Sequence, residues 1–207
     1  MRVRTFIAGP IATNAFLVID DETKEAVVFD APPDVLVDMV GAVREEGVHV
    51  ALLVITHHHW DHVGDADALA SALGAPVAAH PASLPNLEHP SGGPVPITPI
   101  KVDRLLEDGD EVEIGTLKFR VLHTPGHAKG EITLYTAEDQ AMFGGDTLFP
   151  NGYGRTDIPG ASDDETLQTL NRLLELPDDV TVYPGHGQNT TIGAERPWMA
   201  RLTRKLR

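Results

Sequence analysis

Short apolar runs broken by turn residues dominate the first part of the chain and predict β-strands. The runs at residues 2–7, 14–19 and 25–30 are apolar and β-branched, and an acidic turn at 20–23 separates the last two. Residues 50–55 form an uninterrupted apolar run, which is typical of a strand buried on both faces. We therefore expect four strands in this part of the chain.

A different spacing, with apolar residues three and four positions apart, predicts the helices. It begins at Leu36 and continues to Val43, with Asp34 as the expected N-cap and Gly47 as the expected C-terminal stop. The same reasoning predicts three further helices, at 64–73, 164–175 and 192–206.

The later strands follow a loop rich in proline. Residues 81–99 contain six prolines and two adjacent glycines, which predicts an irregular loop of the kind that often has a function. One further strand is expected just before this loop, at 76–79, and four after it, at 117–121, 131–136, 141–144 and 179–183. Because strands occur in two groups with helices after each, we predict two sheets packed face to face with helices outside, in one mixed α/β domain over residues 1–207.

Composition narrows the function classes. The chain has 207 residues, which suits one domain, and it has no cysteine, which excludes disulfides, thiolate nucleophiles and thiolate metal sites. A net charge of -15 disfavours nucleic acid as a partner. No signal peptide or membrane span is apparent, so a cytoplasmic location is the default expectation. The C-terminal cations are expected to complement the dipole of the last helix.

The candidate chemistry lies where strands end. Four segments share one order: an apolar strand, a small or turn-forming residue, then side chains able to bind a metal. Strand ends are rigid, and the loops that leave them often carry functional sites. The segments are 56–62 (THHHWDH), 123–127 (HTPGH), 144–146 (GGD) and 184–187 (PGHG).

The spacing H-x-H-x-D-H in the first segment predicts metal ligands. Residues two apart in extended chain point the same way, so His57 and His59 can aim at one metal. Asp61 and His62 follow after a turn and can aim at a second, whereas His58 points away. Polar side chains directly after a buried strand would be costly to bury without partners.

Four of the remaining histidines are not expected to bind metal. His49, His80 and His89 are isolated and are expected to be ordinary surface or core residues. His123 precedes a ligand motif, and we expect it to support the site rather than bind metal.

These motifs, in this order, resemble the metal motifs of the metallo-β-lactamase superfamily over nearly the whole chain. The resemblance implies a four-layer αββα sandwich with the site at one edge of the two sheets. It also implies that His57, His59 and His127 hold one metal ion, and that a second set holds another ion with Asp146 as the bridge. The second set comprises Asp61, His62 and His186.

Within the superfamily, residues 56–62 and 144–149 are similar to glyoxalase II enzymes. Those enzymes carry a C-terminal helical extension that helps bind glutathione, whereas only about twenty residues follow His186 here. The segments 154–157 (GRTD) and 187–191 (GQNTT) look like short glyoxalase II-like hydrolases. In segment 154–157, Arg155 and Asp157 are expected to pair and fix a loop.

The resemblance implies thioester hydrolysis, with S-lactoylglutathione as a typical small-molecule substrate. Imidazole and carboxylate ligands suit two divalent cations, zinc first, with iron and manganese as alternatives. A hydroxide bridging the two ions would attack the carbonyl, and Asp61 would orient the attacking water and accept its proton. A thiolate leaves with little need for protonation, so no dedicated acid is required.

Three alternatives stay open on the sequence. Persulfide dioxygenases share this scaffold and would use His57, His127 and Asp146 as a mononuclear iron triad. Hydrolysis of a lactone, a β-lactam or a nucleic acid is the second alternative, and a non-catalytic metal-binding module is the third. The exact substrate, the metal and the oligomeric state are left open.

Overall fold

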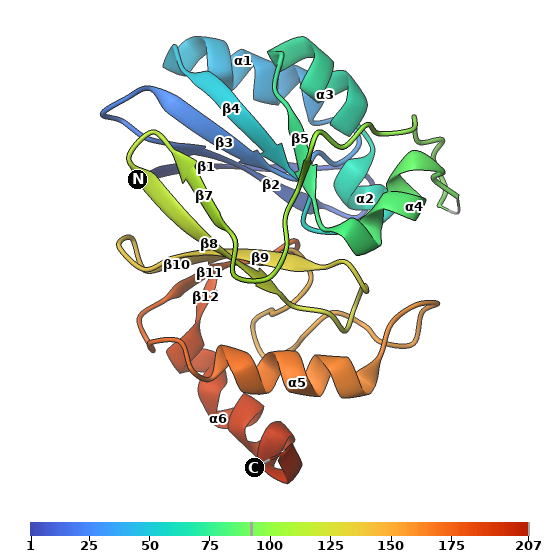
Figure 1. Cartoon of the computed structure of the whole chain (residues 1–207), viewed down its shortest axis with the longest axis vertical. Coiled ribbons are helices and arrows are strands. Elements are labelled where there is room, and N and C mark those ends of the chain that lie inside the picture. The colour runs from blue at the N-terminus through green and yellow to red at the C-terminus, as the bar shows by residue number, and fades with distance from the viewer. Residues whose placement is uncertain (92, 207) are drawn as a thin grey trace.

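The computed structural model describes residues 1–91 and 93–206, and its strands form two six-stranded sheets (Figure 1). The strand order of the first sheet follows the chain. Its strands are β1 (Arg2–Ala8), β2 (Thr13–Ile19), β3 (Glu25–Phe29), β4 (His49–Val54), β5 (Val77–Ala79) and β6 (Arg104–Leu105).

The second sheet is built from the later half of the chain, in the order β12-β11-β10-β9-β8-β7. Its strands are β7 (Glu111–Ile114), β8 (Leu117–His123), β9 (Ile132–Thr136), β10 (Ala141–Phe143), β11 (Thr181–Tyr183) and β12 (Thr190–Thr191). Strand β9 is antiparallel to both β8 and β10, and β11 is parallel to β10. Strands β8, β10 and β11 therefore run the same way and end at one edge.

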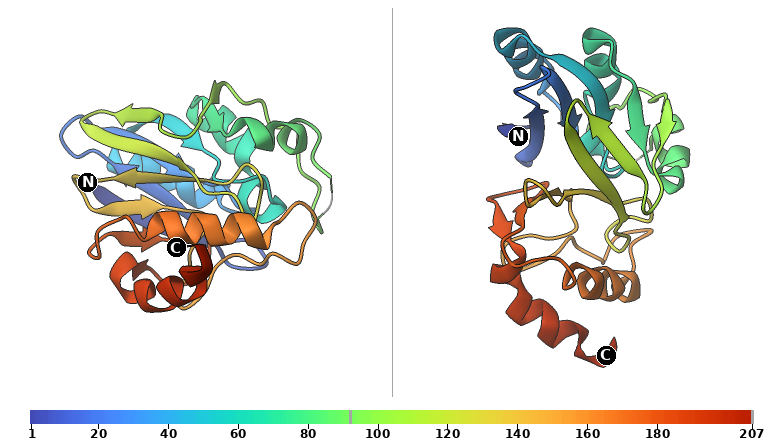
Figure 2. Two further views of the ribbon diagram at one scale, coloured as in Figure 1. Left: turned by 60° about the horizontal axis from the view of Figure 1, so that its bottom comes forward. Right: turned by 60° about the vertical axis from the view of Figure 1, so that its left-hand side comes forward.

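The helices cover the outer faces of the two sheets (Figure 2). Helices α1 (Leu36–Glu46) and α3 (Ala66–Leu73) lie on the first sheet, while α5 (Asp163–Leu173) and α6 (Ile192–Leu202) lie beside the second. Shorter helices occupy the connections: α2 (Trp60–Val63), η1 (Pro81–Ser83), α4 (Leu84–Glu88) and η2 (Thr203–Leu206).

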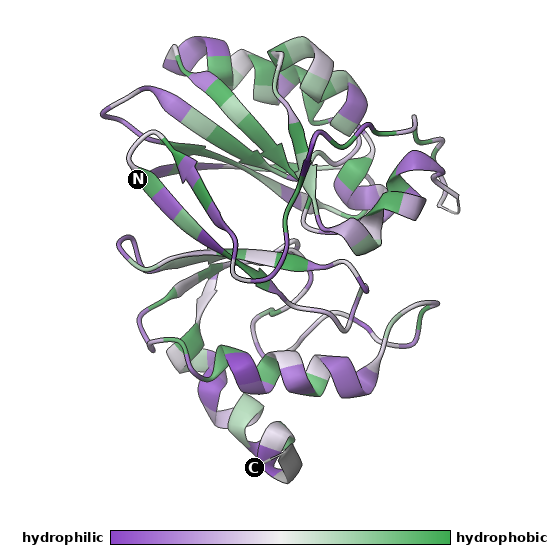
Figure 3. Ribbon diagram, in the orientation of Figure 1, coloured by the Kyte–Doolittle hydropathy of each residue, from purple (hydrophilic) through white to green (hydrophobic). Residues whose placement is uncertain are grey.

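Strand alternation produces the layers. In β2, Phe16 and Val18 face the cluster between the two sheets, whereas Leu17 faces the cluster under α1 and α3. Apolar residues are concentrated on both sheets (Figure 3). Phe29 of the first sheet stacks on Phe143 of the second with ring centroids 4.4 Å apart. Full burial of such a side chain contributes about 1.5–3 kcal/mol, so this layer fixes the two sheets against each other.

The structure confirms the predicted αββα sandwich and the strands and helices foreseen in it. Two expectations are wrong. Asp34 has a positive φ of 70° and precedes the N-cap, Val35. The first backbone N–H of α1, at Leu36, bonds instead to the Asp65 carboxylate at 2.9 Å. The segment 81–99 is not wholly irregular, because η1 and α4 form its first part.

The described residues contain no helix with the length and apolar character needed to span a bilayer.

Candidate metal centre

The first sheet brings four candidate ligands to its edge in one short stretch. Strand β4 ends at Val54, and His57 and His59 follow in extended chain. The short helix α2 then begins at Trp60, with Asp61 and His62 in its single turn. The change from extended chain to helix reorients the last two side chains relative to the first two, and His57, Asp61 and His62 are buried.

The second sheet supplies three more candidates from three separate strand ends. His127 follows β8, Asp146 follows β10 and His186 follows β11. An isolated bridge pairs Thr13 of β2 with His186, so the edges of the two sheets meet at this point. Asn14 strengthens the junction, because its side-chain amide donates to the carbonyl oxygens of Pro184 and Gly187 at 2.9 and 3.0 Å.

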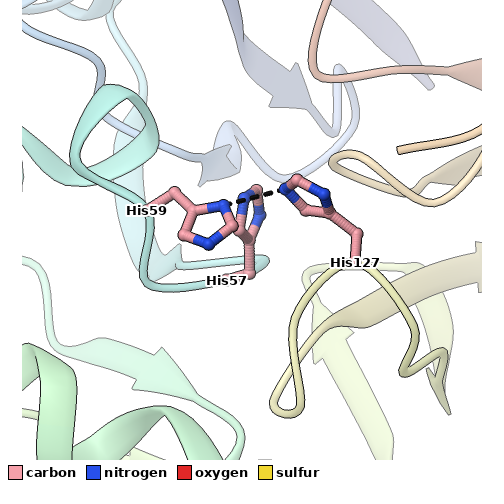
Figure 4. A group of neighbouring side chains, drawn as sticks. All are labelled: His57, His59 and His127. Atoms are coloured by element: carbon pink, nitrogen blue, oxygen red, sulfur yellow. Dashed lines mark hydrogen bonds between the residues drawn. The ribbon is translucent and has the colours of Figure 1, made fainter. Parts of the chain in front are cut away.

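His57, His59 and His127 form what we call the histidine group (Figure 4). One ligand atom from each lies within 4.8 Å of the others. The facing atoms of His59 and His127 are Nδ1 and Nε2, and they are 2.8 Å apart. The Nδ1 atom of His127 donates to the backbone oxygen of Arg155 at 2.9 Å, which leaves Nε2 free to face the group.

Asp61, His62 and His186 form the mixed group, within the same 4.8 Å limit. The Nε2 atom of His186 lies 3.2 Å from Oδ2 of Asp61, and Nε2 of His62 lies 3.3 Å from the same oxygen. Thr13 fixes this carboxylate by donating to it at 3.1 Å.

Asp146 lies between the two groups. Its Oδ1 is 3.3 Å from His62 Nε2, and its Oδ2 is 3.5 Å from His127 Nε2. Gly185 keeps this space open, because a Cβ at that position would stand 2.3 Å from Asp146 Oδ1 and 2.6 Å from His62 Cε1. The two groups are therefore linked through one carboxylate.

The donor atoms fit bound cations. His57 Nε2, His62 Nε2 and Asp146 Oδ1 are buried and have no hydrogen-bond partner among the described residues. Buried polar atoms without partners are costly unless something else satisfies them. Nitrogen and oxygen atoms gathered in this way are the ligand set that zinc, iron and manganese accept. The cluster is thus compatible with divalent metal ions.

A second layer of buried polar residues, which the sequence analysis did not identify, holds these ligands. Asp30 accepts from His62 Nδ1 at 2.7 Å and from both the backbone and the hydroxyl of Thr56 at 2.8 Å. The Thr56 hydroxyl lies 3.2 Å from His57 Nδ1. Glu131 accepts from the backbone N–H of Asp146 at 2.8 Å. Such outer partners fix ring orientation and tautomer.

Burial and charge set opposite protonation states in the two groups. Burial, with the neighbouring histidines, holds the pKa of His57 well below its ordinary value and lowers the pKa of His59 to about 3. Burial also acts to lower the pKa of His62, but the carboxylates of Asp146 and Asp30 outweigh it and raise that pKa well above the ordinary value. Burial acts to raise the pKa of Asp61, but the hydrogen bond with His186 and the nearby imidazoles outweigh it and lower that pKa below the ordinary value.

Other residues singled out in the sequence lie outside the ligand groups. His58 belongs to neither group. His123 stacks on His80 with ring centroids 4.0 Å apart and donates to the Lys129 carbonyl at 2.8 Å. Arg155 and Asp157 pair through two hydrogen bonds, of 2.7 and 2.9 Å. At the basic C-terminus, Arg196 bonds to Asp178 and to two backbone carbonyl oxygens, so its role is structural.

Two hollows adjoin the ligands. The first, which we call the ligand cleft, has a volume of about 760 Å³ and is lined by Asp61, Asp146 and His186. The second, the loop cavity, has a volume of about 520 Å³ and lies against the segment that follows β5. His59, Trp60 and His127 line both, so the two hollows meet at the candidate centre.

Solved structures share this fold. The chain matches the B3 metallo-β-lactamase BLEG-1 with a TM-score of 0.88 and 34% identity, over 98% of this chain and 100% of that one. It matches TTHA1623 in a di-iron-bound form with a TM-score of 0.83 and 36% identity, over 94% and 97% of the chains. ETHE1 from Myxococcus xanthus gives 0.83 and 28%, over 99% and 85%.

Proteins of similar sequence match most of the chain as well. The chain is 33% identical to the hydroxyacylglutathione hydrolase GloC of Haemophilus influenzae, with 88% of this chain and 89% of that protein aligned. It is 31% identical to the probable metallo-hydrolase YqgX of Bacillus subtilis, with 95% of each aligned. The profile of the metallo-beta-lactamase superfamily matches residues 8–186, a span that contains all seven candidate ligands. The chain therefore belongs to the metallo-β-lactamase superfamily.

Proposed function

We propose that this protein is a binuclear metal-dependent thioesterase that hydrolyses small thioesters of the S-lactoylglutathione type. The observation that carries the proposal is the pair of ligand groups joined by Asp146. A mononuclear oxygenase would use one three-residue set and would leave Asp61, His62 and His186 without a function. The identity to the hydroxyacylglutathione hydrolase GloC supports a thioester as the substrate.

The side chains would divide the work as follows. His57, His59 and His127 would hold one cation, Asp61, His62 and His186 the other, and Asp146 both. Two divalent cations supply an acidified water and positive charge near the carbonyl oxygen. Zinc fits these ligands, and iron and manganese also accept them.

Asp61 is the proposed proton acceptor. Its carboxyl has a lowered pKa, so it is ionised at neutral pH. The Thr13 hydroxyl donates to Oδ2 at 3.1 Å and fixes the direction in which the carboxylate presents its lone pairs. A base must stand within hydrogen-bond reach of the water it activates, and Asp61 lines the ligand cleft where the substrate carbonyl would lie.

The experiment is metal analysis combined with an assay panel. The protein, purified without chelators, is expected to carry about two metal ions per chain and to cleave S-lactoylglutathione. Chelation should abolish the activity and a divalent cation should restore it. One iron per chain with persulfide-dependent oxygen uptake would instead establish an oxygenase, and hydrolysis restricted to β-lactams or lactones would also overturn the proposal.

A further inference from the structure

The ligand cleft and the loop cavity differ in chemistry, although both open onto the same histidines. Beyond the candidate metal ligands, the lining of the ligand cleft is largely apolar, with Ile11, Phe149, Pro150 and Ile158. The one cation on its lining, Arg155, is already paired with Asp157. The ligand cleft is therefore suited to an uncharged part of a substrate.

The loop cavity carries an unpaired cation. Lys129 lines it, is exposed, and forms no ion pair or hydrogen bond through its ammonium group with any described residue. The side chain of Asn86 also lines the loop cavity and forms no hydrogen bond with any described residue. Polar groups that face a cavity and have no protein partner are available to a ligand.

The backbone that carries Lys129 is fixed. His123 donates to the Lys129 carbonyl at 2.8 Å, and the Ser83 hydroxyl donates to the Gly130 carbonyl at 3.1 Å. Gly130 also packs so closely that a Cβ there would lie 2.6 Å from the backbone nitrogen of Ser83. The turn is thus clamped between β8 and η1, while the ammonium group remains free.

Another part of the lining is also held. Trp60 lines both hollows, and the Pro-rich segment packs on it at Gly93, where a Cβ would stand 2.8 Å from Trp60 Cγ. The backbone N–H of Ile100 bonds to the Leu87 carbonyl at 2.8 Å and ties the end of this segment to α4. The loop cavity is therefore a built part of the fold.

We propose that the loop cavity is a substrate subsite for a carboxylate, held by Lys129, while the uncharged part of the same substrate occupies the ligand cleft. This inference rests on the proposed function, because a thioester whose carbonyl lies at the shared histidines extends one half into each hollow. In a chain with a net charge of -15, an unpaired lysine beside the centre supplies a local attraction for an anion. The carboxylate can belong to the acyl half or to the thiol half.

Matched substrates distinguish the two halves. Succinyl and butyryl thioesters of N-acetylcysteamine differ in the acyl half, and acetyl thioesters of mercaptopropionate and mercaptoethanol differ in the thiol half. We expect the wild-type kcat/KM to be about 10-fold higher for the charged member of one pair, which corresponds to about 1.4 kcal/mol. The preference should reside in KM and should weaken as salt is added, because Lys129 is exposed.

Lys129→Gln is expected to abolish the preference by raising KM for the charged member alone, with kcat retained. Lys118→Gln is the matched control, since Lys118 lies on β8 beside Glu113 and lines neither hollow. Equal use of both members of each pair by the wild type, or a preference that persists in Lys129→Gln, would overturn the subsite. If no thioester is cleaved at all, the proposed function itself fails, which is a separate outcome.

Discussion

The histidine group and the mixed group lie side by side, yet they are prepared for a cation in different ways. In the histidine group, burial and the neighbouring histidines lower the pKa of His57 and of His59, so both rings are neutral at pH 7. In the mixed group, Asp30 and Asp146 favour the protonated form of His62, so a proton occupies the position that a cation would take. His62 must therefore release a proton before the mixed group binds a cation, whereas His57 and His59 carry no proton that a cation must displace.

This difference follows from the kinds of side chain that make up each group. The histidine group sets two imidazoles from the first sheet against one from the second, with no carboxylate among its members. The mixed group combines Asp61 with His62 and His186. Carboxylates reduce the electrostatic repulsion between two neighbouring cations. The mixed group should therefore allow a second ion to bind beside the first, although its affinity for a metal should be the lower of the two.

The strongest test of the comparison removes the residue that both groups share. Asp146→Ala should lower metal content toward zero and reduce kcat by at least about 1,000-fold, because water activation depends on the cations. Elemental analysis and steady-state kinetics measure both effects. A variant that keeps two metal ions would show that the groups are independent and that Asp146 is not a bridge.

A smaller effect is expected when only the mixed group is broken. Asp61→Ala should remove one of two metal ions and lower kcat by about 100-fold, since it also removes the proposed proton acceptor. His58→Ala is the matched control from the same segment, and it should change kcat less than about threefold, because His58 belongs to neither group. Equal losses in the two variants would contradict the division of residues 56–62 into ligands and non-ligands.

The buried carboxyl behind the centre gives a stability test. Burial and the nearby Asp146 raise the pKa of Glu131 well above its ordinary value, which favours its neutral form in the metal-free protein. Glu131→Gln preserves the acceptor for the Asp146 N–H and should leave the free energy of unfolding nearly unchanged. Glu131→Ala removes that acceptor and should cost about 1–3 kcal/mol. Chemical denaturation of the metal-free variants measures this, and equal losses would refute a neutral Glu131.

The sequence was sufficient for residues whose partners lie close by in the chain. The period of two places His57 and His59 together, and apolar spacing located most strands and the four longer helices, α1, α3, α5 and α6. Asp30 could also have been found, because it follows the apolar strand β3 just as the candidate ligands follow theirs.

Contacts between distant segments were beyond reach. Asn14 bonds to Pro184, 170 residues away, because the edges of the two sheets meet there. Helix α1 is capped by Asp65 from 29 residues away, which a local rule applied to Asp34 could not foresee. Strands β6 and β12 span two residues each, too short for any period to appear.

The smallest expected effect is a difference in the number of protons that the two groups release when each binds a metal ion. Histidine must lose its proton to bind a metal, so cation uptake is linked to pH wherever the imidazole is charged beforehand. His59, with a pKa of about 3, and His57, whose pKa is also lowered, are neutral from pH 7 down past the ordinary value of 6.5. The first ion should therefore bind to the histidine group with almost no proton release.

The second ion should behave differently, because the pKa of His62 is raised and a cation must displace its proton. The pKa of His186 is raised as well, so uptake at neutral pH should release about one to two protons, and the affinity of the mixed group should fall at least about 10-fold for each pH unit of acidification. On acidification the mixed group should thus lose its ion first, and activity should fall while one ion is still bound. Calorimetric titration of the metal-free protein in buffers of different ionisation enthalpy measures the protons. Equal release for both ions would show that the two groups are electrostatically alike.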